Sequence, residues 1–278
     1  MKKVSVLARQ RLLGRPTHRA TRRVMPFIAA LFLATPLAGP ITPLLARSTF
    51  PAVVPVAPVT VAAPGHVARF DEQLRATYAA LGVQQQGLQY AVFEQAMTGY
   101  LNLRRQGRVG PQQRLAVIDF DLPSTEKRLW VLDLVSHKVL YRTLVAHGNN
   151  SGEQQATRFS NTTDSHMSSL GFYVTGGEYL GKHGRSLRLA GVDEGFNTNA
   201  AARSIVVHGA DYVSEAFIRQ NGRLGRSQGC PALPLDQYGP VIETLKGGAG
   251  LFIHKSNAGY SSRYLNEQAA SIGLPAAS

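Results

Sequence analysis

The residue of this chain most suited to take part in a reaction is Cys230, the only cysteine among 278 residues. It stands in the run Ser227-Gln-Gly-Cys-Pro231, which begins nineteen residues after His208. A thiol attacks as its thiolate, and an ordinary pKa of about 8.5 leaves little thiolate at neutral pH. A histidine within hydrogen-bonding reach would supply the missing base. Gly229 would permit a tight turn, and backbone N–H groups around it could hold a developing oxyanion.

Two other interpretations of these residues remain open. An unpaired cysteine is commonly a small buried hydrophobic residue, and the cysteine count alone does not choose between the two roles. The histidines could instead suggest zinc, and His208 with Asp211 is the closest approach to a ligand pair. The spacing of the histidines is not the tight spacing of a zinc motif. We therefore predict no metal and no cofactor, with an exported zinc peptidase as an alternative.

Charge is concentrated at the start of the chain. The formal net charge is +13, but eight basic residues and no acidic ones precede residue 24, which leaves the rest at about +5. An apolar run broken by prolines follows, over residues 24–46. A basic region followed by an apolar one is typical of a secretory signal peptide, here 1–46. The scattered charges that remain argue against nucleic acid as a partner.

The elements that must position Cys230 and His208 follow from periodicity. Residues 47–69 are rich in Pro, Ala and Val and predict an extended linker. Apolar residues at three- and four-residue steps predict two helices in a flank over 70–110, connected near 82–87. Six apolar or aromatic side chains should pack this flank on the following domain: Phe70, Leu74, Tyr78, Phe93, Met97 and Tyr100.

After Gly110 the chain becomes β-like, with short runs of β-branched and aromatic residues between turn residues. The predicted strands are 115–120, 128–134, 139–145, 170–175, 186–189, 204–207 and 250–254, with helices over 212–219 and 235–246. Gly176-Gly177 and Gly247-Gly248 are predicted to be turns. The fold class is therefore mostly β (α+β). The main domain should cover 111–260, and 261–278 should form a flexible tail.

Several segments together resemble one family, the murein L,D-transpeptidase catalytic domain (YkuD-like). Those that carry the resemblance are Ile118–Phe120, Ser124–Leu129, Val145–Gly148, Ser168–Val174, Gly181–Gly184, Arg203–Ala210 and Leu224–Pro231. The resemblance implies a β-rich catalytic domain that acts on peptidoglycan stem peptides by covalent catalysis. Carried over by position, Cys230 is the nucleophile and His208 the base, with the backbone of Gly209 orienting the imidazole. The N–H groups of Gln228, Gly229 and Cys230 become the oxyanion donors.

The chain departs from the family pattern at two places. Gln228 stands where a second histidine is usual, and Pro231-Ala232 follow the cysteine where an apolar residue and an arginine are usual. If that arginine holds a substrate carboxylate, Arg226 or Arg223 would have to replace it. The alternative role for Arg226 is to pin its own loop through backbone carbonyls or an acidic residue. The residues expected to contact substrate are Arg226, Ser227, His183 and Tyr173.

The sequence thus predicts an exported peptidoglycan L,D-transpeptidase of the periplasm or cell envelope, with stem peptides as substrate and carbapenem-type acylating inhibitors as possible ligands. Three alternatives remain: an L,D-carboxypeptidase using the same residues, the zinc peptidase, and a non-catalytic wall-binding protein. Donor stem length, acceptor residue and oligomeric state are not encoded in any motif we find.

Overall fold

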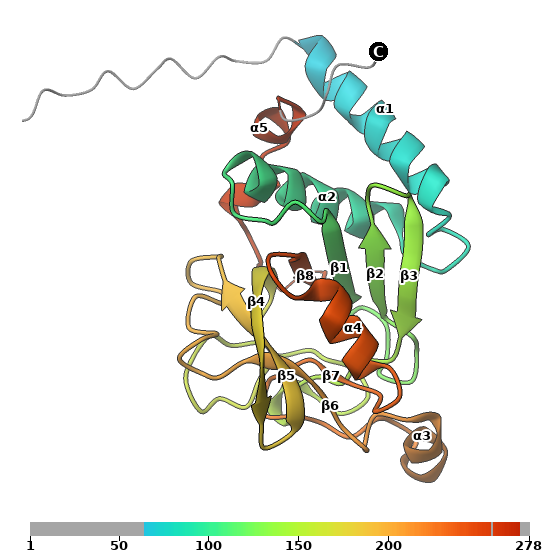
Figure 1. The fold of residues 1–278 in the computed structure, drawn as a ribbon, viewed down its shortest axis with the longest axis vertical. Helices are drawn as coiled ribbons and strands as arrows, with labels where there is room; N and C mark the ends of the chain where they lie inside the picture. The colour runs from blue at the N-terminus through green and yellow to red at the C-terminus, as the bar shows by residue number, and fades with distance from the viewer. Residues whose placement is uncertain (1–63, 257, 273–278) are drawn as a thin grey trace, which may run out of the picture. The chain divides into compact units, whose positions relative to one another are not determined.

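A computed structural model of the chain describes residues 64–256 and 258–272 (Figure 1). The predicted signal peptide and most of the predicted linker lie outside these residues. The two predicted helices are present as α1 (Pro64–Leu81) and α2 (Tyr90–Arg105). Helix α1 begins within the segment predicted to be an extended linker.

One mixed sheet dominates the described part of the chain. Its eight strands are β1 (Arg114–Asp119), β2 (Leu129–Asp133), β3 (Lys138–Thr143), β4 (Gly171–Gly181), β5 (Gly184–Gly191), β6 (Val206–Gly209), β7 (Ala232–Leu233) and β8 (Gly250–His254). Their order is β3-β2-β1-β8-β4-β5-β6-β7. Neighbouring strands are antiparallel except for β1 with β8 and β6 with β7. The predicted mostly β fold with a small N-terminal helical part is confirmed.

Two strand features were not predicted. The Gly176-Gly177 pair does not end a strand, because β4 continues through it with a register shift between Thr175 and Glu178 and pairs with β5 as far as Gly181. The shift is the mark of a β-bulge, which a double glycine accommodates easily. The short strand β7 directly follows the Cys230 loop and pairs in parallel with β6. These features shape the functional region described below.

Side chains alternate between the two faces of the sheet, and each face is covered. On β1, Leu115 and Val117 join one hydrophobic cluster with α1 and α2, whereas Ala116 and Ile118 join a second cluster with the helix α4 (Tyr238–Leu245). This period of two is what a strand buried on both faces requires. All six side chains predicted to pack the helical flank lie in the first cluster, Tyr78 only partly buried. Figure 1 shows α4 crossing in front of the sheet.

The predicted flexible tail is corrected as far as residue 272. A short 3₁₀ turn (Arg263–Leu265) and the helix α5 (Glu267–Ser271) follow the last strand. Tyr264 is completely buried, and the Asn102 side chain donates to the Tyr264 and Asn266 carbonyls at 2.8 and 2.9 Å. The polar composition of this segment concealed one large aromatic anchor, and burying it orders the chain around it.

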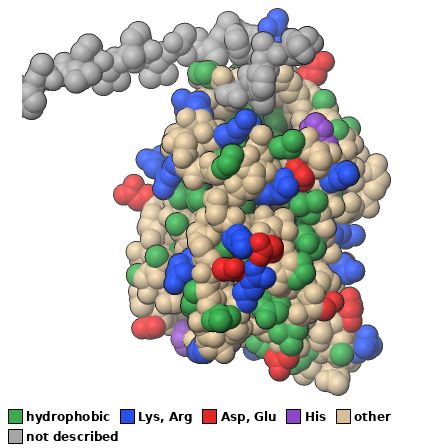
Figure 2. Space-filling model, viewed as in Figure 1, with side chains coloured by type: hydrophobic (Ala, Val, Ile, Leu, Met, Phe, Trp, Pro, Cys, Tyr) green, Lys and Arg blue, Asp and Glu red, His purple; other side chains and the backbone are tan. Residues whose placement is uncertain are grey.

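The remaining helix, α3 (Glu215–Asn221), lies between β6 and the Cys230 loop. Among the described residues, no helix is both long and apolar enough to cross a membrane. On the face that Figure 2 shows, basic and acidic side chains are interspersed, with no large area of one sign. That face offers no basic stripe of the kind that nucleic-acid binding requires.

Candidate active site

Strand pairing brings the predicted nucleophile and base to one cleft. His208 on β6 pairs with Ala232 on β7, two residues after Cys230. Both side chains line a cleft of about 730 Å³, together with residues from the β4–β5 turn, the 149–166 loops and the Arg203–Ser204 segment. Residues separated in sequence by more than twenty positions therefore face the same space, as the predicted chemistry requires.

His208 is held in a defined tautomer. Its imidazole is buried, and Nδ1 lies 2.9 Å from the Gly209 carbonyl oxygen. A carbonyl only accepts hydrogen bonds, so Nδ1 carries the proton and Nε2 keeps its lone pair. Burial lowers the pKa of His208 below its usual 6.5. The imidazole is therefore neutral at pH 7 and able to accept a proton, with Gly209 in the orienting position that the family resemblance implied.

The Cys230 sulfur lies against the entry of β6. The Val206 N–H donates to Sγ at 3.4 Å, and Sγ lies 3.6 Å from the Ser204 carbonyl oxygen as a donor. Burial raises the pKa of this thiol above its ordinary value, so the resting group is a protonated thiol. Among the described residues, no imidazole forms a hydrogen bond with the sulfur. His208 and Cys230 thus line one cleft, but the hydrogen bond expected between them is not formed.

Backbone donors near the sulfur differ from the three expected. The Gly229 N–H donates to the Ser227 hydroxyl at 3.0 Å, and this hydroxyl donates to the Cys230 carbonyl at 2.6 Å. Gly229 is therefore committed within the loop and is not a free oxyanion donor. In the part of the chain that the structure describes, the amides of Gln228 and Cys230 have no hydrogen-bond acceptor. These two amides remain able to hold an oxyanion.

Gly229 is required by its backbone conformation. Its φ is +120°, a region that residues with a side chain rarely adopt. A Cβ there would lie 2.7 Å from the Met167 carbonyl oxygen. Only glycine therefore fits at this position of the Cys230 loop. Ser204, whose carbonyl oxygen lies 3.6 Å from the sulfur, has a positive φ of 55° without being glycine, an uncommon backbone conformation.

Arg226 takes the alternative role considered for it. Its Nη1 donates to the carbonyls of Asn149 and Gly152 at 3.2 and 3.0 Å and to the Glu153 carboxylate at 2.7 Å. Arg223 pairs with the same carboxylate at 3.0 Å. Arg226 borders the cleft, but its guanidinium pins the Cys230 loop to the 149–153 turn. The expectation that it binds a substrate carboxylate is not supported by this geometry.

Two other expected substrate contacts are corrected by burial. Tyr173 is fully buried, donates its hydroxyl to the Ser169 carbonyl at 3.0 Å, and lies in the core rather than in the cleft. Ser227 does border the cleft, but its hydroxyl is occupied by the Gly229 and Cys230 backbone. His183 lies in the cleft and contacts His208, with ring centroids 4.6 Å apart.

Sequence reasoning missed two cationic residues of the cleft. Arg203 lines it and donates to the Ser160 and Met167 carbonyls, each at 2.6 Å, and to two serine hydroxyls. Lys182 lines it from the β4–β5 turn and, within the described residues, forms no ion pair. Both charges favour the thiolate form of Cys230. Their sequence positions could have indicated this, because Arg203 shortly precedes the strand that holds His208 and Lys182 directly precedes His183.

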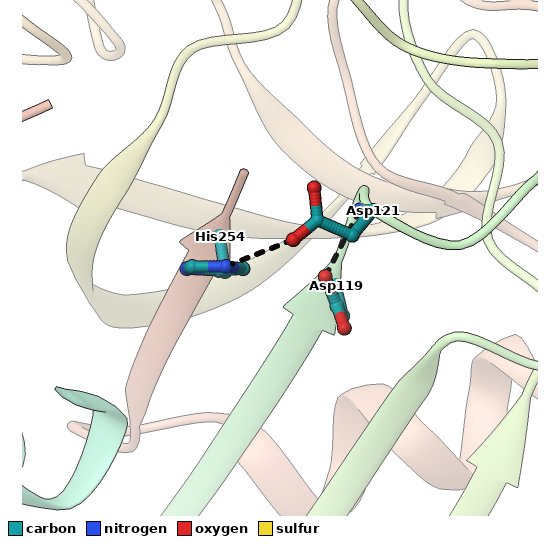
Figure 3. Close-up of side chains that lie close together, drawn as sticks. All are labelled: Asp119, Asp121 and His254. Carbon is teal, nitrogen blue, oxygen red and sulfur yellow. Dashed lines mark hydrogen bonds and ion pairs between the residues drawn. The ribbon is translucent and has the colours of Figure 1, made fainter. Parts of the chain in front are cut away.

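A second polar cluster lies at the ends of β1 and β8. Figure 3 shows His254 directed at the Asp121 carboxylate, 3.2 Å away, with Asp119 beside them. Of the described residues, these three form the one group with metal-ligand geometry, and neither His208 nor Asp211 belongs to it. Asp121 already accepts from Lys255 at 2.9 Å and from the Ser256 hydroxyl at 2.5 Å. Its donors are thus protein groups, which makes the cluster a clamp between two strand ends.

The fold and the cleft agree with a match to a known family. The model of the L,D-transpeptidase catalytic domain family matches residues 84–254, more than half of the chain and all of the strands described above. The chain belongs to this family. A search of curated proteins finds no match.

A comparison with solved structures finds distant likenesses. An L,D-transpeptidase from Mycobacterium smegmatis is 13% identical, with 51% of this chain and 59% of that chain covered and a TM-score of 0.33. One from Stackebrandtia nassauensis is 15% identical, with coverages of 55% and 60% and a TM-score of 0.32. The helical cell shape determining protein Pgp2 from Campylobacter jejuni is 14% identical, with coverages of 65% and 61% and a TM-score of 0.36. The chain spans about three fifths of the length of these proteins.

Proposed function

We propose that this chain is a peptidoglycan L,D-transpeptidase that transfers an acyl group of a stem peptide through a thioester on Cys230, with His208 as the base. The observation that carries the proposal is the shared cleft. It holds a thiol and a neutral imidazole beside two backbone amides, and within the described residues neither Nε2 nor these amides has a hydrogen-bond partner. Acyl transfer by a thiol needs these three parts.

The proposed reaction uses these groups in turn. The sulfur turns from the Ser204 carbonyl toward His208, and its proton passes to Nε2 as sulfur attacks the substrate carbonyl carbon. The Gln228 and Cys230 amides hold the oxyanion. The tetrahedral intermediate then collapses to the thioester, and the leaving amine takes the proton from the imidazolium. An acceptor amine attacks the thioester, gives its proton to His208, and the released thiolate recovers that proton.

We propose that a residue other than Arg226 binds the substrate carboxylate, because Arg226 already pairs with Glu153. Lys182 lines the cleft and its ammonium has no carboxylate partner within the described residues. A stem peptide carries carboxylates, so this cation is the natural partner from the β4–β5 turn. Replacing Lys182 by Met should raise the donor KM several-fold, whereas Arg226→Lys should lower the melting temperature. An unchanged KM in Lys182→Met would remove this assignment.

Mass spectrometry after exposure to a carbapenem tests the nucleophile. A carbapenem is a strained amide that acylates a nucleophile, so we expect one adduct per chain, located on Cys230, and none in Cys230→Ala. An adduct elsewhere would contradict the proposal. The zinc peptidase alternative predicts instead that chelators abolish activity, which the thiol mechanism does not.

The acceptor decides between transpeptidase and carboxypeptidase, since both use the same thioester. We expect purified protein with disaccharide tetrapeptide and an added D-amino acid to form the exchanged peptide in preference to the shortened one. Formation of the shortened peptide alone would identify the L,D-carboxypeptidase. We also propose that the protein acts in the cell envelope, where its substrate lies, which is supported by the basic-then-apolar order of residues 1–46.

A further inference from the structure

The turn between β4 and β5 places a second imidazole on the base. These strands pair as far as Gly181 with Gly184, so Lys182 and His183 form a two-residue turn. The His183 ring stacks on the His208 ring, with centroids 4.6 Å apart and planes inclined by 25°. His183 is exposed, whereas His208 is buried beneath it. The turn therefore covers one face of the predicted base.

Helix α4 fixes both sides of this stack. Arg185 of β5 pairs with Glu178 of β4 and with Glu243 of α4, and Lys246 bonds the same two carboxylates at 3.4 and 2.7 Å. The same helix supplies Tyr238, whose ring is packed so closely on Gly209 that a Cβ there would lie 2.7 Å from it. Helix α4 therefore contacts both the β4–β5 hairpin and the His208-Gly209 backbone, and so fixes their relative positions.

A general base must keep its lone pair aimed at the proton that it removes. The second side-chain torsion of histidine is intrinsically broad, so one hydrogen bond at Nδ1 leaves the ring plane only partly defined. Contact with a flat ring on its face restricts that plane. We propose that His183 is a positioning residue that holds the plane of the His208 imidazole and keeps its Nε2 directed into the cleft.

The stack also favours the neutral base. Burial is the largest cause that lowers the pKa of His208, and the neighbouring His183 and Lys182 lower it further. The other titratable or charged groups that line the cleft are Asp164, His166, Tyr179, Arg203, Tyr212, Arg226 and Cys230, and Tyr238 packs on Gly209. Asp164 is the one carboxylate among them, and it is not among the groups that shift the pKa of His208.

Two substitutions at His183 separate the effect of the ring from that of the charge. His183→Phe keeps a flat ring without a titratable nitrogen, and His183→Ala removes both. His137→Asn, in the exposed turn between β2 and β3, is the matched control. With the donor peptide, we expect His183→Ala to lower kcat about tenfold with KM within about twofold, and His183→Phe to lower kcat no more than about threefold. The control should match the parent protein.

NMR titration of histidine-labelled protein gives a readout that does not require turnover. We expect the His208 pKa to rise toward its ordinary value in both His183 variants and to stay unchanged in His137→Asn. The positioning role rests on the proposed function, but this titration tests the contact between the two rings even if the parent protein is inactive. An inactive parent protein with the expected titration would contradict the proposed function and not the contact. An unchanged His208 titration, or a raised KM with unchanged kcat in His183→Ala, would overturn the inference.

Discussion

The His208–Cys230 cleft and the Asp119–Asp121–His254 cluster combine similar side chains at strand ends, yet they differ in how far their polar groups are satisfied. In the cluster, Asp121 accepts from Lys255, Ser256 and His254. In the cleft, an imidazole nitrogen and two amides have no hydrogen-bond partner among the described residues, and Ser204 beside the sulfur has an uncommon positive φ. Saturated groups stabilise a fold, whereas open and strained groups are characteristic of reaction sites.

The largest effect is expected from removing the thiol from the cleft, a change that should not disturb the fold. Cys230→Ala should reduce transpeptidation at least about 1,000-fold, because no other thiol is present to form the thioester. The side chain is small and only half-buried, so the free energy of unfolding should change by less than about 1 kcal/mol. Activity assay and urea denaturation on the same sample check both. Retained activity would show that Cys230 is a structural residue and not the nucleophile.

The second prediction concerns the buried scaffold beneath the cleft. His147 accepts from Arg128 at Nδ1, and burial, then the neighbouring Arg128, lowers its pKa from 6.5 to about 4. The fold thus requires neutral His147. Its contribution is complete above about pH 6.5 and is lost as the pH falls through about 4, for a total of about 3 kcal/mol.

Denaturant unfolding between pH 7.5 and 3.5 measures this contribution as a difference between variants. His147→Asn keeps an acceptor for Arg128 without a titrating ring, so its stability should fall less over this range than that of the parent protein. His137→Asn, at an exposed histidine, should follow the parent curve. Equal slopes in all three proteins would show that His147 is not held neutral.

The third prediction tests backbone strain beside the thiol. Gly229→Ala should cost about 2 kcal/mol of unfolding free energy, since alanine disfavours a φ of +120° and its Cβ would contact the Met167 carbonyl. Carbapenem acylation should slow as well, because the amides on either side move. Gly195→Ala, at a positive φ with open space around it, is the matched control for strain alone. Equal costs at both positions would remove the role of the close contact.

The smallest effect is expected at the clamp. Hydrogen bonds from Ser256 and Lys255 lower the pKa of Asp121 to about 2, despite burial that raises it. Asp121→Asn should therefore lose about 1 kcal/mol at neutral pH, after allowance for solvent screening, with kcat unchanged. This loss should vanish as the pH falls from about 3.8 toward 2. Thermal melting with and without added Zn²⁺ completes the test. A rise in melting temperature with the metal would show that the cluster binds metal.

Local pattern was sufficient for much of the fold. Short runs of β-branched and aromatic residues between turn residues predicted the strands from 114 to 143 and at 250–254, and helical spacing predicted the flank that packs on them. The sequence also singled out one thiol and one histidine, and both line the same cleft, although no hydrogen bond joins them in the described residues. These features depend on neighbours in sequence or on residue type alone.

Tertiary structure decided which partner each polar side chain found. Arg226 bonds Glu153 from across the sequence, Tyr173 faces the core instead of the cleft, and Tyr264 orders a segment whose composition looked like a tail. The contact of His183 with His208 depends on β4 continuing through a double glycine that pattern alone reads as a turn. Periodicity determines which face of an element is apolar, but hydrogen-bond partners are chosen by distance in the folded chain, and local sequence does not carry that distance.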